Sequence, residues 1–208
     1  MHLSAAQRDV LTELGNIGIS RAARQLSALL DEPIRIAVPS VELCTVEEAV
    51  RHLVPAGSEQ AGEIACVYQR MSGELAGRIA LLLPSREYHL LFQSLLGRNA
   101  SLQGLDLRAY EHEAMTEIGN ILISSCVSAM ADMLAVRIDV SVPRFTEATA
   151  HDLFTDEAAD SSEQPALLIH ASLSAAEREL DGAIMLMLSA AAAERVMLAV
   201  QALILAAD

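Results

Sequence analysis

The chain repeats itself, and this repeat constrains the fold more than any other feature of the sequence. Residues 12–20 (Thr-Glu-Leu-Gly-Asn-Ile-Gly-Ile-Ser) return as residues 116–124 (Thr-Glu-Ile-Gly-Asn-Ile-Leu-Ile-Ser), displaced by 104 positions. The same displacement relates Pro39 to Pro143 and residues 58–60 to residues 162–164. We interpret the chain as a single domain built from two repeats, about residues 1–102 and 103–208.

Both repeats predict the same order of elements, α–β–(short α)–β–β–α. The expected helices are residues 3–30, 46–54, 86–96, 107–134 and 189–205, and the expected strands are residues 34–38, 62–70, 75–83, 136–142, 166–173 and 183–188. Ser4 and Gln7 form a capping-box pattern at the first helix, and Pro39 is expected at the end of its strand or on a sheet edge. The acidic segment 147–164 predicts a loop. Three strands make a poor domain alone, so the sequence predicts an α/β (α+β) fold with pseudo-two-fold symmetry: one shared, mostly antiparallel six-stranded sheet with the two long helices on one face.

The repeated segment places polar residues on one side of each long helix. At 100° per residue, Asp9, Glu13, Asn16 and Ser20 fall within a sector of roughly 60°, and Glu113, Glu117, Asn120 and Ser124 repeat it. One interpretation is an amphipathic helix whose polar side is only solvated. However, asparagine and glycine are poor residues for a helix interior, and both recur beside the same glutamate. This favours a functional face, and Gly15 and Gly119 would let another surface approach closely.

Composition excludes several classes of function. The net charge of −14 argues against nucleic acid or an anionic membrane as a partner. The chain has no lysine, which excludes Schiff-base chemistry and a Walker-type phosphate loop. Its three cysteines do not form a C-x-x-C pair. The consecutive side chains of Glu111, His112 and Glu113 would project from different sides of a helix. For both reasons no metal site is expected. The sequence shows no signal-peptide pattern, and charged residues interrupt the apolar tail, so we expect a cytoplasmic protein.

A glutamate and an asparagine one helical turn apart project in the same direction. The asparagine amide can accept a hydrogen bond from water and donate another, but it cannot act as a nucleophile or a general base at neutral pH. It can orient a water molecule for attack on an activated group, while the glutamate pairs with a cation of a partner. This equipment suits a phosphatase that completes the active site of another protein.

These residues resemble the CheC, CheX and FliY phosphatases of bacterial chemotaxis, whose pattern is Asp/Ser-x3-Glu-x2-Asn-x22-Pro. The first copy supplies Asp9, Glu13, Asn16 and Pro39, and the second supplies Glu117, Asn120 and Pro143. The second copy departs from the pattern at its first position, where Glu113 stands for Asp or Ser. Two copies in one domain are the layout of CheC.

The resemblance implies hydrolysis of the aspartyl phosphate on a CheY-type response regulator. Asn16 or Asn120 would align the attacking water, and Glu13 or Glu117 would pair with a lysine of the regulator. Mg²⁺ would belong to the regulator, so the chain needs no cofactor of its own. The alternative is a non-catalytic adaptor that binds a response regulator or the receptor deamidase CheD, since related folds also serve as structural parts of the flagellar motor switch.

Overall fold

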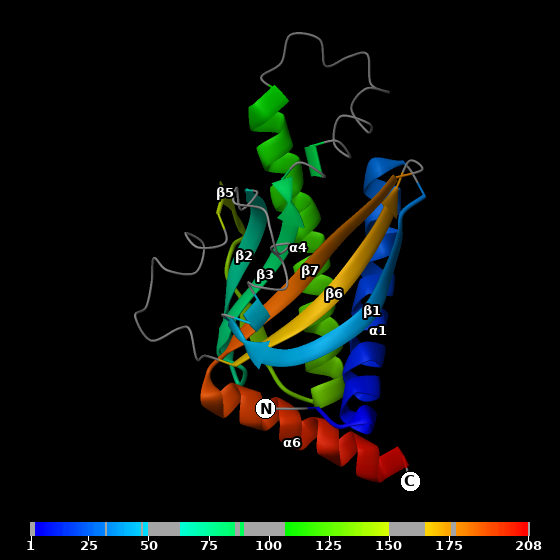
Figure 1. Cartoon of the computed structure of the whole chain (residues 1–208), viewed down its shortest axis with the longest axis vertical. Helices are drawn as coiled ribbons and strands as arrows, with labels where there is room; N and C mark the ends of the chain where they lie inside the picture. The colour runs from blue at the N-terminus through cyan, green and yellow to red at the C-terminus, as the bar shows by residue number, and fades with distance from the viewer. Residues whose placement is uncertain are drawn as a thin grey trace.

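The computed structural model describes residues 3–31, 33–46, 48–49, 63–85, 88–89, 107–149, 165–175 and 178–207. The helices are α1 (Ala5–Leu30), α4 (Leu107–Leu134) and α6 (Ala190–Ala207), and the strands are β1 (Arg35–Thr45), β2 (Ile64–Gly73), β3 (Gly77–Pro84), β4 (Ile138–Val140), β5 (Arg144–Ala148), β6 (Pro165–Ala175) and β7 (Arg178–Leu188) (Figure 1). The short helices expected at residues 46–54 and 86–96 lie mostly outside the described residues. So does most of the acidic loop expected at residues 147–164.

The strands form one antiparallel sheet in which the two halves of the chain interleave. Its order is β1-β6-β7-β3-β2-β4, and β5 also pairs with β2. The first strand of each half therefore pairs with the hairpin of the other half: β1 with β6, and β4 and β5 with β2. Because β3 and β7 pair at the centre, the order reads the same from either edge when the halves are exchanged. A duplication would produce this symmetry. The boundary near residue 102 lies outside the described residues and stays a prediction.

The mixed α/β class and the shared sheet are confirmed, but the sheet has seven strands in place of the expected six. The strand expected at residues 136–142 shrinks to β4, and β5 follows it, partly inside the segment expected to be a loop. Both segments lie along β2, with Val140 opposite Met71 and Phe145 opposite Val67. Pro143 lies between them, and because proline has no N–H to donate, the ladder is interrupted there.

Pro39 does not end its strand, which corrects one of the two expectations for this residue. β1 continues to Thr45, and a register shift between Ala37 and Ser40 absorbs the proline. The other expectation, an edge position, is confirmed, because β1 is the first strand of the sheet. An edge strand tolerates a missing N–H where a buried strand does not.

The two long helices begin and end close to the predicted residues. Ser4 caps α1 in a full capping box: its hydroxyl accepts from the Gln7 N–H at 3.2 Å, and its own N–H donates to Gln7 Oε1 at 2.9 Å. α1 and α4 lie side by side on one face of the sheet and run in opposite directions, while α6 crosses one end of the molecule (Figure 1).

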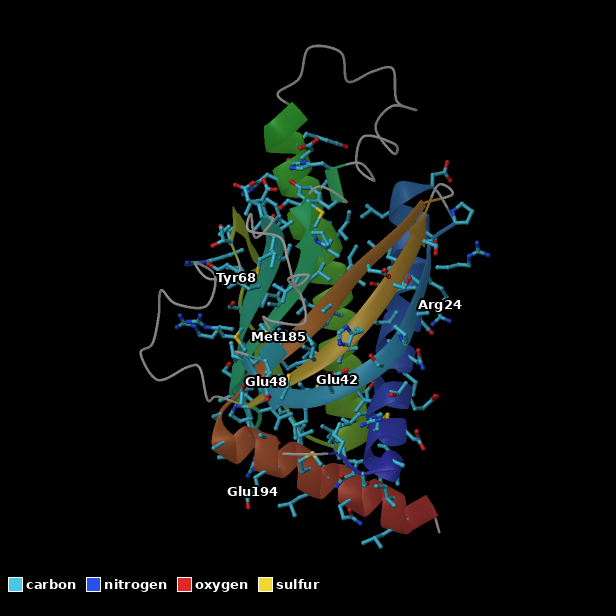
Figure 2. All side chains as sticks on the ribbon, viewed as in Figure 1. Arg24, Glu42, Glu48, Tyr68, Met185 and Glu194 are labelled. Carbon is cyan, nitrogen blue, oxygen red and sulfur yellow. The ribbon has the colours of Figure 1, made fainter. Side chains whose placement is uncertain are left out.

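An aliphatic core fills the space between the helices and the sheet. It includes Leu14 of α1, Ile123 of α4 and Val67 of β2, all buried. Alternate residues of the same strands, such as Leu168 and the labelled Met185, form a second apolar cluster on the other face (Figure 2). Residues 110–134 of α4 are long and apolar enough to cross a membrane by length and composition. Buried core helices meet the same test, however, and more than half of the most apolar window is buried inside the protein.

Candidate functional site

The glycine of each motif seats its helix on the sheet. A β-carbon at Gly119 would lie 2.5 Å from Val67 Cβ of β2, which is closer than carbon atoms can approach. At Gly15 the nearest atoms are Val38 Cγ1 at 3.4 Å and Ile169 Cγ2 at 3.5 Å, an ordinary contact. The surface that approaches these glycines is therefore the protein's own sheet. Packing therefore requires a glycine at residue 119, whereas an alanine would fit at residue 15.

The predicted polar residues lie on the outer surface of both helices. Asp9, Glu13 and Ser20 of α1 are exposed and Asn16 is half-buried. On α4, Glu113 and Glu117 are exposed, while Asn120 and Ser124 are half-buried. Each asparagine therefore sits at the border between the core and the solvent, one turn from an exposed carboxylate. This arrangement can present an amide to a partner while the fold restrains its backbone.

The prolines of the motif lie at the two edges of the sheet, Pro39 within β1 and Pro143 between β4 and β5. Pro39 is exposed in β1 and directly follows Val38, the residue that packs beneath Gly15. Pro143 lies between β4 and β5, the corresponding edge of the second half. Each proline therefore marks an irregular point in an outer strand, and neither carries a group that could take part in proton transfer.

The two sites face away from each other. The helices contact one another through Gly18, where a β-carbon would lie 2.8 Å from Cys126 Cα, and through an ion pair between Arg21 and Asp132 with an N–O distance of 3.1 Å. Asn16 lies two residues before Gly18, which places it about 160° around the helix from that contact. Asn120 lies nine residues before Ala129, which also approaches Gly18, and this places it about 180° around α4 from the contact. The structure thus brings each Glu–Asn pair together and keeps the two pairs apart on opposite flanks.

The asparagine of the second site is held by its own protein. Asn120 Oδ1 accepts a hydrogen bond from Gln69 Nε2 of β2 at 2.9 Å and a longer one from Ser124 Oγ at 3.4 Å. Gln69 is 1% exposed, and its own Oε1 is buried with no hydrogen-bond partner among the described residues. The sequence reasoning missed Gln69, because a strand residue 51 positions away cannot be related to the helix by any local pattern.

The first site lacks this restraint. Gly15 packs on Ile169 of β6 as Gly119 packs on Val67 of β2, so these strand residues correspond. Two residues further along the same strands, Ala171 occupies the place of Gln69. Within the part of the chain that the structure describes, the Asn16 side chain makes no hydrogen bond. The two sites therefore share the glutamate and the asparagine and differ in the residue beneath the asparagine.

A histidine bridge near the start of α4 was also missed. His89 Nδ1 lies 3.4 Å from Glu111 Oε2 of α4, and His89 Nε2 lies 3.2 Å from Glu147 Oε1 of β5. These residues are far apart in sequence and have no recognisable spacing. The bridge ties α4 to the edge of the sheet, which is a structural role. Among the described residues, no three His, Cys, Asp or Glu side chains are grouped as metal ligands.

The cysteines are unsuited to nucleophilic chemistry. Burial raises the pKa of Cys66 and of Cys126 to about 12. Burial and the nearby carboxylates of Glu42 and Glu48 raise the pKa of Cys44 to about 11. All three remain thiols at neutral pH, whereas the thiolate is the reactive form.

Solved structures of other proteins have the same fold as this chain. The structure is similar to that of Thermotoga maritima FliY, with a TM-score of 0.74, 20% identity, and 97% of this chain and 98% of that chain covered. It is also similar to the FliM middle domain of Helicobacter pylori, with a TM-score of 0.65, 10% identity, and 94% and 99% of the two chains covered. At these identities the likeness establishes the fold alone: an α/β domain of the kind found in FliY and FliM.

Sequence comparison shows which proteins with this fold resemble the chain in the motif segments. The model of the CheC-like family matches residues 7–43 and 113–147, the two segments that carry the motif. The CheY-P phosphatase CheC of Bacillus subtilis is 30% identical over 138 residues, which are 66% of this chain and 64% of that protein. In both motif segments the chain is therefore similar to the CheC-like family. It spans slightly less than two thirds of the length of this relative.

Proposed function

We propose that the protein is a phosphatase that hydrolyses the aspartyl phosphate of a CheY-type response regulator. The observation that carries the proposal is the Glu–Asn pair, which occurs twice, on two outward-facing helix surfaces, with each asparagine at the border of the core. The names of relatives support it, since the Bacillus subtilis proteins that match are called CheY-P phosphatase CheC and flagellar motor switch phosphatase FliY.

In the proposed reaction the chain supplies position and the regulator supplies the activated group. Asn16 or Asn120 enters the regulator's site and holds a water molecule in line with the phosphorus atom. The water oxygen bonds to phosphorus as the bond between phosphorus and the aspartyl oxygen breaks, and the aspartate leaves as a carboxylate. One proton stays on the released phosphate and the other passes to solvent. Positioning of this kind contributes about 10²–10³ to the rate, by analogy with one oxyanion-hole donor.

The glutamates have a different task from the asparagines. Glu13 and Glu117 are exposed, so each carboxylate can pair with a lysine of the regulator without a large desolvation cost. Such a pair holds the regulator in both the ground state and the transition state. Mg²⁺ is assigned to the regulator in this proposal. The proposed site of action is the cytoplasm, with neither nucleic acid nor membrane as a partner.

The test is phosphate release from a phosphorylated CheY-type regulator, measured with catalytic amounts of the protein. Asn16→Ala combined with Asn120→Ala should lower the stimulated rate by about 10²–10³, and each single variant should retain part of it because the sites are separate. Gln25→Ala, an exposed position of α1 outside the motif, is the matched control. A double variant that remains fully active would refute the assignment.

The glutamate variants separate binding from catalysis. Glu13→Ala with Glu117→Ala should raise KM with little change in kcat, whereas the asparagine variants should lower kcat. If both pairs of variants changed only KM, the asparagines would be docking residues.

The second candidate is an adaptor that binds a response regulator or CheD without turnover. The observation in its favour is the fold, which the chain shares with the FliM middle domain. An adaptor would bind the phosphorylated regulator with no acceleration of phosphate release. The same assay therefore decides between the two candidates, since binding can be measured in parallel by titration.

A further inference from the structure

Gln69 is a buried polar residue between β2 and α4 whose presence the fold alone does not explain. Its side chain is 1% exposed, it donates to Asn120 Oδ1 at 2.9 Å, and its Oε1 is buried without a partner among the described residues. A buried carbonyl without a hydrogen bond destabilises a fold. An unbranched apolar side chain such as methionine would fill the same space without this penalty. Stability therefore does not account for glutamine at this position.

We propose that Gln69 is a positioning residue for the second site: it holds the Asn120 carboxamide in the orientation that the reaction needs. This inference rests on the proposed phosphatase function. Gln69 is buried beneath the helix and cannot reach the regulator, so it acts only through Asn120. A free asparagine side chain rotates about its terminal torsion, which has a broad energy minimum. A hydrogen bond from the rigid β2 strand removes this freedom before the regulator binds.

The geometry also indicates which acceptor position of Asn120 Oδ1 receives the hydrogen bond from the attacking water. A carbonyl oxygen has two acceptor positions. At Asn120 one is occupied by Gln69 at 2.9 Å and the other by the longer 3.4 Å bond from Ser124. The bond from Ser124 is the weaker of the two, because hydrogen bonds weaken as the distance grows. The attacking water takes the place of the Ser124 hydroxyl, while Gln69 keeps the amide in place.

The first site provides an internal comparison. Ala171 occupies the corresponding strand position and has no side-chain donor, so none of the described residues holds the Asn16 side chain by a hydrogen bond. The two sites thus have the same asparagine amide, but only in the second site does a buried side chain hold that amide in one orientation. A substitution at Gln69 should affect one site and leave the other as it was.

The experiment places Gln69→Met in two backgrounds and measures phosphate release from the phosphorylated regulator. With Asn16→Ala, only the second site remains, and Gln69→Met should lower kcat by roughly threefold to tenfold with KM unchanged, the effect of losing one hydrogen bond. With Asn120→Ala, no amide remains to be positioned, so the rate should equal that of Asn120→Ala alone. Equal losses in both backgrounds, or no loss in either, would overturn the proposal.

Two further measurements separate this proposal from the phosphatase assignment. The denaturation midpoint of Gln69→Met should equal or exceed that of the wild type, so a loss of activity cannot come from unfolding; a lower midpoint would give Gln69 a structural role. The side-chain NMR order parameter of Asn120 Nδ2 should fall in Gln69→Met, while that of Asn16 stays the same. If wild-type protein does not accelerate phosphate release, the proposed function fails, and the order parameter still tests the restraint. An unchanged value for Asn120 would overturn it.

Discussion

Gly119→Ala and Gly15→Ala are the same substitution at equivalent positions of the two motifs, and the structure predicts opposite effects on stability. At Gly119 the new methyl carbon would lie 2.5 Å from both Cβ and Cγ1 of Val67 and 2.6 Å from its Cγ2. Val67 is a β-branched residue with no exposed surface, so no rotation of its side chain can relieve the contact. At Gly15 the nearest atoms are 3.4 Å away.

The expected magnitudes follow from two opposing effects. Alanine stabilises a helix interior by about 1 kcal/mol relative to glycine. Overpacking of a dense core costs about 1–3 kcal/mol, and three clashing atoms place Gly119→Ala near the upper end of that range. Gly119→Ala should therefore lower the free energy of unfolding by about 2 kcal/mol, whereas Gly15→Ala should raise it by up to about 1 kcal/mol.

Urea denaturation followed by circular dichroism measures both variants under identical conditions. With an m-value of about 2–3 kcal/mol/M, the two midpoints should differ by about 1 M. Equal shifts in the same direction would refute the reasoning, because they would show that the contact with Val67 does not decide the sign of the effect. A shift of α4 away from β2 would also lengthen the 2.9 Å bond from Gln69 to Asn120, so Gly119→Ala should weaken the second site in the Asn16→Ala background.

Two further predictions concern stability. Ser4→Ala should lower the free energy of unfolding by about 1 kcal/mol, since it removes the cap of α1, while Ser128→Ala at an exposed position of α4 should change it little. Burial raises the pKa of Cys66 and Cys126 to about 12, whereas in the unfolded chain thiols ionise near pH 8.5. The unfolded state therefore binds fewer protons between these values, and stability should fall as the pH rises from about 8.5 toward 12. The Cys66→Ala/Cys126→Ala variant should show a smaller fall in denaturation midpoint between pH 8 and pH 10, and an equal fall would contradict the assignment.

The long helices could be predicted from the sequence because their signals are local. The capping box at Ser4 marks the start of α1, and the repeat transfers the same helix to residues 107–134, where α4 is found. For the same reason the polar residues of each motif could be placed together on one side of their own helix, since helical periodicity determines their direction. The symmetry of the sheet follows from the repeat as well, as two short halves must share one core.

The strand ends and the support of the second site could not be predicted in this way. A proline usually ends a strand, but the penalty depends on whether its missing N–H faces a partner strand, and this is known only once β1 is seen at an edge. β5 exists because residues 144–148 pair with β2, about 80 positions earlier in the chain. The bond from Gln69 to Asn120 is likewise a product of tertiary packing.

The pattern of differences between the repeats indicates which surface meets a partner. Packing usually restricts buried residues, whereas exposed positions tolerate most substitutions. Two inner positions differ between the halves: the buried Gly18 corresponds to the buried Leu122, and the half-buried Ala171 corresponds to the buried Gln69. The exposed glutamate and the half-buried asparagine are nevertheless the same on both helices. The fold does not require this identity, whereas the proposed function does, because the regulator would have to meet the same glutamate and asparagine on either helix.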